Sequence, residues 1–295
     1  MNHDSCVVCN SLNLEDFLIV EDYTVSGEEF PLVKCNDCGI AMTQTVPTEE
    51  EIGSYYKSDD YISHSDTQEG LMNSMYHKVR KYMLGKKSQI VSDFTGLSKG
   101  SLLDIGCGTG YFGGEMTSKG WSVMGLEPSP EARLVAVSKF GLQAKDPSEL
   151  YKLEAEKFDA VTMWHVLEHV HKLNEYLQTI HKVLKPGGLL LIAVPNHESF
   201  DAKYYKKHWA AYDVPRHLWH FTPNSMNELV EKHGFTIEKH KRMPFDAFYV
   251  SLLSEKYRNN KLALLMGGLI GKLSWINSWS SAKKCSSVIY LCRKN

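Results

Sequence analysis

Short apolar runs alternate with helical patterns through the second half of the chain. Alternation of this kind predicts an α/β fold, in which a parallel sheet is covered by helices. The predicted strands lie at 101–105, 121–126, 141–145, 158–163, 188–194, 235–240 and 286–292. The predicted helices lie at 71–94, 110–119, 129–139, 147–155, 172–184 and 223–233. A sharp helix-to-strand turn is expected at Pro186-Gly187-Gly188.

The regular pattern is absent from several segments, and these suggest the domain organisation. We expect a small module at 1–46, a linker or lid at 47–70 and a main domain at 71–295. The main domain carries two insertions, at 197–222 and 245–280. The first is rich in aromatic and histidine residues, and long loops of this kind within compact folds are usually functional. The second is apolar and is expected to form a few short helical segments.

Composition and charge exclude some classes of protein. The 43% apolar and 23% charged content is ordinary for a globular chain. A net charge of −2 and a pI of about 6.7 argue against a general nucleic-acid partner. The N-terminus has no signal-peptide pattern, and the apolar patch at 262–270 is too short to be a transmembrane segment. We therefore expect a cytoplasmic protein with reduced thiols.

Four of the seven cysteines form two C-x-x-C pairs near the N-terminus: Cys6, Cys9, Cys35 and Cys38. Two such turns can supply the four thiolates of a tetrahedral zinc site, which would fold a small β-rich module. A four-cysteine site has no open position, so its zinc would be structural. The alternatives are four unrelated reduced cysteines, or a redox pair.

The stretch LLDIGCGTG, at 102–110, contains the strongest ligand-binding pattern. An apolar strand leads into a glycine turn and then into a helix, which makes a cradle for the polar part of a nucleotide-like ligand. Glu127 ends the next apolar run, 21 residues beyond Gly106. A carboxylate at this distance can bind a ribose diol. The glycine spacing is G-x-G-x-G and differs from the dinucleotide pattern G-x-G-x-x-G.

These features resemble the class I S-adenosylmethionine-dependent methyltransferases, including the ubiquinone-type members. The resemblance covers about residues 70–295 and rests on LLDIGCGTG, Glu127, FDAVTMWHVLEHV and VLKPGGLLLIAVPN in order. It implies a Rossmann-like, seven-stranded, mostly parallel sheet with helices on both faces. The segment YTVSGEEFPLVKCNDCG, by a looser likeness, is similar to the zinc-binding front end of sugar C-methyltransferases.

The resemblance also implies a cofactor, S-adenosyl-L-methionine, with S-adenosylhomocysteine as product. The cofactor-binding residues implied are Asp104, Gly106, Cys107, Gly108, Gly110, Glu127, Pro128, Asp146, Trp164 and His165. The glycines would let the backbone approach the methionine moiety, with Asp104 near its ammonium group and Glu127 at the ribose hydroxyls. Asp146 is expected either at the adenine amino group or as a helix N-cap. Cys107 is expected to be a buried filler.

Methyl transfer to a hydroxyl or a carbon acid also requires removal of a proton, for which histidine is suited. The catalytic candidates are His165, His217 and His220. An equal alternative is that Arg216 and His217 anchor the loop. Further acceptor-side candidates are Tyr61, His64, Tyr205, Trp209 and Tyr212.

The turn WHVLEH places His165, Glu168 and His169 on one helical face. Ubiquinone-type O-methyltransferases carry Glu-x-x-Glu-His here and use it for a divalent metal. His165 replaces the first glutamate, so structural hydrogen bonding is preferred over a metal role.

The leading hypothesis is a methyltransferase acting on a small-molecule acceptor, for which a sugar or glycan precursor is one option. The alternatives are a non-catalytic S-adenosylmethionine-binding adaptor and an NAD-dependent oxidoreductase or epimerase. Nucleic-acid methylation is disfavoured, because no N-P-P-Y-type tetrapeptide follows the fourth strand. The apolar 245–280 insertion suggests a helical cover, a homodimer contact or a lipid-like substrate.

Overall fold

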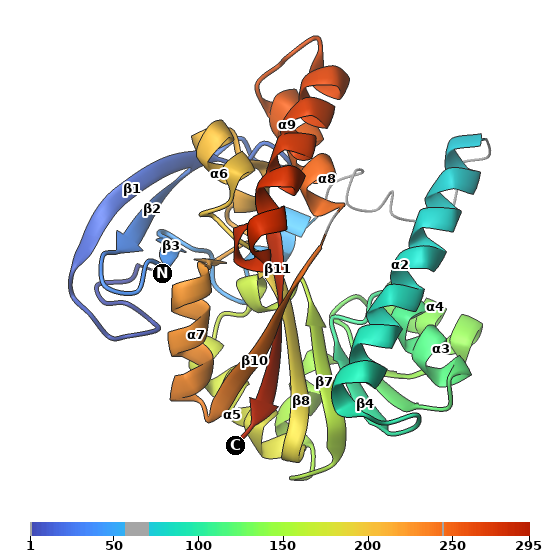
Figure 1. Cartoon of the computed structure of the whole chain (residues 1–295). Helices are drawn as coiled ribbons and strands as arrows, with labels where there is room; N and C mark the ends of the chain where they lie inside the picture. The colour runs from blue at the N-terminus through green and yellow to red at the C-terminus, as the bar shows by residue number, and fades with distance from the viewer. Residues whose placement is uncertain (1, 57–70, 244) are drawn as a thin grey trace.

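The computed structural model describes residues 2–56, 71–243 and 245–295, with only the backbone described at 71–79 (Figure 1). Its centre is a seven-stranded sheet in the order β10-β11-β8-β7-β4-β5-β6. The strands are β4 (Ser101–Ile105), β5 (Ser122–Leu126), β6 (Gln143–Lys145), β7 (Phe158–Trp164), β8 (Leu184–Pro195), β10 (Phe235–Arg242) and β11 (Ser287–Lys294). Only β11 runs antiparallel to its neighbours, β8 and β10. The predicted fold class is confirmed.

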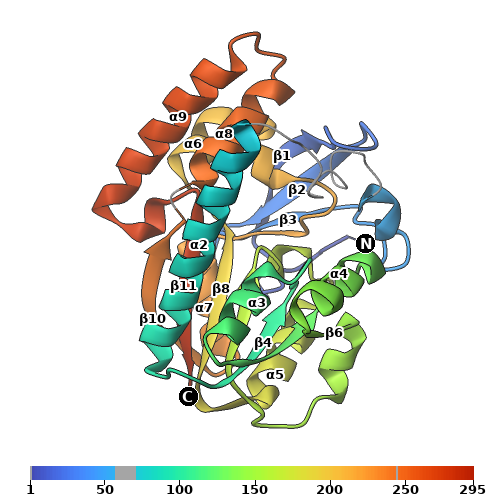
Figure 2. The same cartoon turned by 90° about the vertical axis from the view of Figure 1, so that its right-hand side faces the viewer.

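Helices cover both faces of this sheet, because its strands are apolar on both sides. Leu102 belongs to one buried cluster and its neighbour Leu103 to the other, as expected where side chains alternate across a strand. One face is covered by α5 (Leu173–Val183) and α7 (Pro223–Lys232). The other is covered by α2 (Leu71–Thr95), α3 (Tyr111–Ser118) and α4 (Pro130–Phe140), of which α2 and α3 lie in front of the sheet in Figure 2.

Three predicted elements differ in detail from the structure. The helix expected at 147–155 is the 3-10 helix η2 (Pro147–Lys152). The turn expected at 186–188 lies inside β8, where Gly187 has a φ of +68°. The insertion at 245–280 consists mainly of two long helices, α8 (Asp246–Tyr257) and α9 (Ala263–Asn277), followed by η6 (Ser278–Ser280) and η7 (Ala282–Lys284). No helix of the described residues is long and apolar enough to cross a membrane.

A second sheet, with all its pairs antiparallel, lies at the N-terminus in the order β1-β2-β3-β9. Strands β1 (Leu14–Glu21), β2 (Glu29–Cys35) and β3 (Ala41–Thr43) come from the predicted module. The fourth strand, β9 (Trp219–His220), comes from the predicted insertion at 197–222. This insertion also forms α6 (Phe200–Tyr205), η4 (Lys206–His208) and η5 (Ala210–Tyr212). The N-terminal segment and this insertion therefore share one sheet.

Candidate functional site

The glycine loop between β4 and α3 is tightly packed on two sides and open at its middle. Gly106 and Gly110 have φ values of +70° and +82°, and a Cβ at either would approach a neighbouring side chain within 3 Å. The amides of Gly106 and Cys107 both donate to the Leu126 carbonyl, at 2.7 and 3.0 Å. Gly108 has a φ of +52°, and a Cβ there would meet no atom of the described residues within 4 Å. The loop therefore presents its backbone at Gly108 to a ligand.

Glu127 faces this loop from the end of β5, because β4 and β5 are parallel neighbours. One carboxylate oxygen accepts from the Gly108 amide at 2.9 Å and the other from the Ser129 amide at 2.9 Å. Pro128 continues the turn, and Ser129 caps α4 through the Ala132 amide at 3.1 Å. The predicted pairing of a glycine loop with an acidic side chain is thus present in space.

Asp104 lies buried beneath the loop, near the side chains of Thr162 and Lys87. The Thr162 hydroxyl donates to its carboxylate at 2.7 Å. Burial raises the pKa of Asp104 to about 7, against the opposing effects of Thr162 and the cation Lys87. Lys87 comes from α2 and lies 4.2 Å from the centre of the Trp164 ring. The buried Trp164 indole nitrogen has no hydrogen-bond partner among the described residues.

Two other predicted cofactor-binding residues, Cys107 and Asp146, make contacts with neighbouring residues of the chain. Cys107 packs against Gly125, where a Cβ would lie 2.5 Å from its sulfur, and burial raises the pKa of its thiol to about 12. Asp146 caps η2 by accepting from the Ser148 amide at 3.0 Å. Its second oxygen lies 3.4 Å from Arg133. The N-cap interpretation of Asp146 therefore holds, and an adenine contact stays a prediction.

His165 lies at the end of β7 between two carboxylates. Its Nε2 is 3.0 Å from Asp246 and its Nδ1 is 3.4 Å from Glu168. Burial opposes its protonation, but these two carboxylates raise the pKa of His165 to about 10. Its φ of +59° is unusual for a side chain larger than glycine and marks a constrained position. At neutral pH this imidazole is a cation, so it has no lone pair with which to accept a proton.

Glu168, His169 and His217 bring their ligand atoms within 4.8 Å of one another. The Nδ1 of His169 is 3.0 Å from the Arg216 carbonyl, and the Nδ1 of His217 is 2.8 Å from the Ala211 carbonyl. A carbonyl can only accept, so each Nδ1 carries a proton, and in the neutral form of either ring the lone pair lies on Nε2. Glu168 is buried, and neither of its oxygens has a hydrogen-bond partner within the described parts of the chain.

His220 and Arg216 make interactions that hold the structure together. The Thr43 hydroxyl donates to the His217 carbonyl at 2.8 Å, so His220 Nε2 must donate to Thr43, at 2.9 Å. Burial lowers the pKa of His220 well below its usual value. Arg216 is buried and pairs with Asp22 at 2.9 Å and Asp213 at 2.7 Å. Of the alternatives for this segment, anchoring describes Arg216, whereas His217 belongs to the histidine and glutamate cluster.

The aromatic candidates for the acceptor side divide into two groups. Tyr205, Trp209 and Tyr212 are buried in a core cluster, where the Tyr205 hydroxyl donates to Glu255 and the Trp209 indole to Asp201. Tyr61 and His64 lie outside the described residues. From the same predicted linker or lid, η1 (Ile52–Tyr56) contributes the Tyr56 hydroxyl, 3.0 Å from His169 Nδ1.

Two residues of the site could not be found by sequence reasoning. Asp246 begins α8 in the apolar insertion, and no motif in the sequence links it to His165. Lys87 lies in α2, where a lysine in an amphipathic pattern is usually solvated. Only the packing of α2 against β7 and β8 brings it to the loop.

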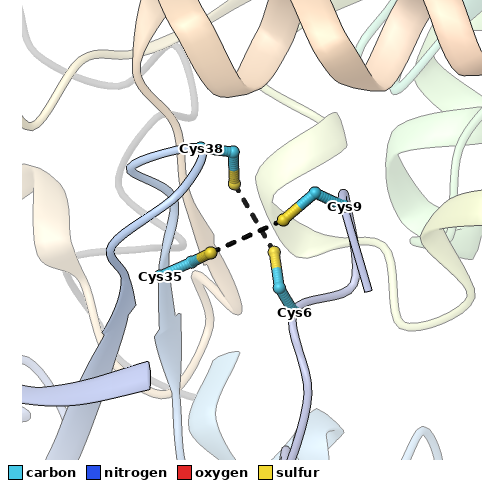
Figure 3. Close-up of side chains that lie close together, drawn as sticks. All are labelled: Cys6, Cys9, Cys35 and Cys38. Carbon is cyan, nitrogen blue, oxygen red and sulfur yellow. Dashed lines mark hydrogen bonds between the residues drawn. The ribbon is translucent and has the colours of Figure 1, made fainter. Parts of the chain in front are cut away.

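The four N-terminal cysteines converge on one point (Figure 3). The Sγ atoms of Cys6 and Cys38 are 3.5 Å apart, as are those of Cys9 and Cys35. Sulfurs placed about 2.3 Å from one tetrahedral ion would be about 3.8 Å apart, so the cluster fits zinc and is too open for disulfides. Each pair is followed by a residue with positive φ, Asn10 or Gly39, which completes the turn.

Comparison with known proteins supports the class of protein that this site defines. A family model described as "Methyltransferase domain" matches residues 75–240, more than half of the chain, so the chain belongs to this family. The resemblance to class I S-adenosylmethionine-dependent methyltransferases is thereby confirmed.

Among the relatives is a ubiquinone biosynthesis O-methyltransferase from Dinoroseobacter shibae, 31% identical over 175 residues. That match covers 55% of this chain and 69% of the relative. The mitochondrial ubiquinone biosynthesis O-methyltransferase of Rattus norvegicus is 29% identical over 168 residues, which cover 52% of this chain and 49% of the relative. The chain thus spans about half to two thirds of the length of such curated relatives.

A similar solved structure is the Burkholderia thailandensis 1,6-didemethyltoxoflavin-N1-methyltransferase with bound 1,6-didemethyltoxoflavin and S-adenosylhomocysteine. Its TM-score is 0.51 at 17% identity, and the match covers 88% of this chain and 97% of that structure. At this identity the likeness concerns the fold alone.

Proposed function

We propose that this chain transfers a methyl group from S-adenosylmethionine to an oxygen of a small-molecule acceptor. The observation that carries the proposal is the glycine loop, which is open at Gly108 and faced there by the carboxylate of Glu127. A loop of this kind provides a backbone surface for the ligand and an acceptor for a ribose diol in one place. The relatives that are O-methyltransferases support oxygen as the atom methylated.

Charged residues around the loop suggest how the cofactor would be held. Glu127 would accept hydrogen bonds from the ribose hydroxyls. Asp104 would face the ammonium group of the methionine moiety, and Lys87 would attract its carboxylate. The second oxygen of Asp146, which lies 3.4 Å from Arg133, would also accept from the adenine amino group. When bound, the cofactor supplies an electrophilic methyl carbon, so the chain has to align the acceptor and receive its proton.

His217 is the best-placed group to receive that proton. Its Nδ1–H is held by the Ala211 carbonyl, which leaves the lone pair on Nε2. Asp213 lies 3.9 Å from Nε2 and would stabilise the imidazolium that forms. His165 is already protonated between its carboxylates, so we assign it an electrostatic and positioning role. The buried His220 is assigned a structural role.

A second mode of acceptor activation is favoured by buried Glu168, whose oxygens accept no hydrogen bond from the described residues, although one of them lies 3.4 Å from His165. Glu168, His169 and His217 would hold a divalent cation, and the carbonyls on both Nδ1 atoms would orient the imidazole ligands. The cation would act as a Lewis acid on the acceptor oxygen. The four-cysteine cluster would hold a separate, structural zinc ion.

Calorimetry with S-adenosylhomocysteine tests the proposed function. The wild-type chain should bind it, and Glu127→Gln should weaken binding by at least about tenfold, since a carboxylate–diol contact is replaced by a neutral one. The exposed Glu131→Gln is the matched control and should bind as wild type. Absence of heat with the wild type would refute the proposal, and binding of NAD instead would indicate an oxidoreductase.

Chelation separates the two modes of acceptor activation. With His217 as the base, activity should survive removal of loosely bound divalent ions. Loss of activity in a chelator, restored by Mg²⁺ or Mn²⁺, would show that the metal mode operates.

A further inference from the structure

The outer side of α9 is a continuous apolar stripe of exposed side chains. Its members follow one another at helical spacing: Leu262, Leu265, Leu269, Leu273 and Ile276, with Trp279 just beyond the helix. Leu264, beside the stripe, is 77% exposed, and Leu265 is 69% exposed. A helix on the surface of a globular protein normally turns such residues towards the core.

The inner side of the same helix explains why the large residues point outwards. Gly267 and Gly271 lie against the backbone of α8, where a Cβ would come within 2.7 Å of Leu252 and Phe248. Ser274 donates to the buried Asp201 at 2.6 Å. Small residues therefore make the close packing with α8 (Figure 1), and the leucines of the stripe are not needed for it.

The segment that contains the stripe carries charged residues of one sign, and Arg258 at its start pairs with the buried Glu255 at 3.8 Å. Residues 256–284 contain six basic residues and no acidic one: Lys256, Arg258, Lys261, Lys272, Lys283 and Lys284. All six are exposed, in a chain whose net charge is −2. Apolar side chains flanked by lysine and tryptophan are typical of helices that lie in the interface of a membrane. Basic residues are attracted to the surface of anionic lipids.

We propose that the apolar stripe of α9, with the six exposed basic residues of the segment 256–284, docks on the surface of an anionic membrane. The 15-residue helix would lie in the interface, since it is too short to cross a bilayer. A second copy of the chain is a poorer occupant, because a two-fold interface through this stripe would bring the two sets of positive charges together. An anionic lipid surface complements both the stripe and its charges.

This docking would bring the membrane close to the methyl-transfer site. Helix α8, on which α9 packs, begins at Asp246, the residue that pairs with His165. In Figure 1 both helices lie at the end of the sheet where β7 ends. An acceptor carried in the membrane surface would therefore meet the site without leaving the lipid. The docking itself does not depend on the proposed function, and its test requires no turnover.

Flotation of the full chain with lipid vesicles tests the proposal. The wild type should float with vesicles of phosphatidylcholine and phosphatidylglycerol, and much less with phosphatidylcholine alone. The double variant Leu265→Glu, Leu269→Glu should reduce the bound fraction at least about tenfold, because it buries two charges in the interface. Leu134→Glu, Val137→Glu is the matched control, since both residues are exposed on α4, away from the stripe. It should bind as wild type.

A second pair of measurements tests the role of charge. Lys261→Ser, Lys272→Ser should weaken binding to the anionic vesicles about fivefold for each lysine lost. Raising the salt concentration should have a similar effect. Vesicle binding that is equal in the α9 and α4 variants would overturn the proposal. The proposal would also be overturned if the wild-type chain did not bind vesicles and instead formed a dimer, and if the Leu265→Glu, Leu269→Glu variant were monomeric.

Discussion

At the scale of single residues, the site contains several ionisable side chains. Their protonation states differ because each has different neighbours. Asp246 and Glu168 hold His165 as a cation and raise its pKa to about 10. Burial beside His217 lowers the pKa of His169 to about 4, so its ring is neutral at pH 7. Histidines that look equivalent in the sequence are therefore suited to different tasks, because burial and nearby carboxylates shift the pKa in opposite directions.

A first prediction concerns His217. His217→Gln should lower kcat by about 10²–10⁴-fold with little change in KM, because the lone pair that receives the acceptor's proton is removed. His220→Gln is the control: the glutamine amide can also donate to Thr43, so β9 should stay paired with β3 and kcat should be nearly unchanged. Equal falls in kcat for both variants would contradict the assignment.

A second prediction concerns the pH dependence of stability at His165. Its pKa is raised from 6.5 to about 10 in the folded chain, so the stabilisation is complete below pH 6.5 and is lost as pH rises through about 10. Asp246→Asn removes the closer carboxylate. The wild type should exceed this variant in Tm by about 2–4 °C below pH 6.5, and the difference should vanish above pH 10. Thermal unfolding across this range measures it, and a difference independent of pH would refute the account.

At the scale of the elements, the strand–turn–helix units were predicted well because each depends on a short stretch of sequence. The run from Leu102 to Gly110 contains the apolar residues of β4, the glycines of the turn and the beginning of α3. The two helices at 246–277 were not predicted as such, since glycines and outward leucines obscure the usual helical pattern. Cross-chain contacts such as that of His165 with Asp246 leave no trace in the local sequence.

The glycine turn yields a third prediction, based on two glycines in similar environments. Gly108 and Gly141 have φ values of +52° and +66°, and a Cβ at either would meet no described atom within 4 Å. Alanine at either position should therefore cost a similar stability, about 1–2 kcal/mol. Only Gly108→Ala should also weaken S-adenosylhomocysteine binding, by at least about tenfold, because its Cβ would occupy the ligand's space. Calorimetry and thermal unfolding measure both effects, and equal binding by the two variants would place the ligand elsewhere.

At the scale of the whole molecule, the N-terminal sheet and the acceptor-side segment form one unit. Strand β9 pairs with β3, and Thr43 and His220 are in contact although 177 positions apart in the chain. Arg216 adds a buried ion pair to Asp22 in the N-terminal segment. The cluster of four cysteines was predicted from the spacing of the two C-x-x-C pairs alone. The pairing of the His217 segment with the N-terminal sheet could not be predicted, because β9 is two residues long and has no strand pattern.

This coupling leads to a fourth prediction, that the cysteine cluster supports methyl transfer from a distance. Cys35 ends β2, which pairs with β3 and through it with β9, so loss of a metal there should loosen the segment that carries His217. Cys35→Ser should lose about one zinc ion per chain and lower kcat at least about tenfold. S-adenosylhomocysteine binding should persist, because the glycine loop and Glu127 belong to the other sheet. Elemental analysis, kinetics and calorimetry on one preparation would measure all three effects.

Cys285→Ser supplies the control that separates the cluster from general effects of losing a buried thiol. The Cys285 sulfur lies 3.5 Å from the Met243 carbonyl, to which a serine hydroxyl could also donate. This variant should keep its zinc, its kcat and its affinity for S-adenosylhomocysteine. If the wild-type chain contained no zinc, the assignment of a structural zinc ion to the four cysteines would be wrong. A zinc-free Cys35→Ser chain with full activity would show that the acceptor side is held by Arg216 and the core packing, independently of the metal.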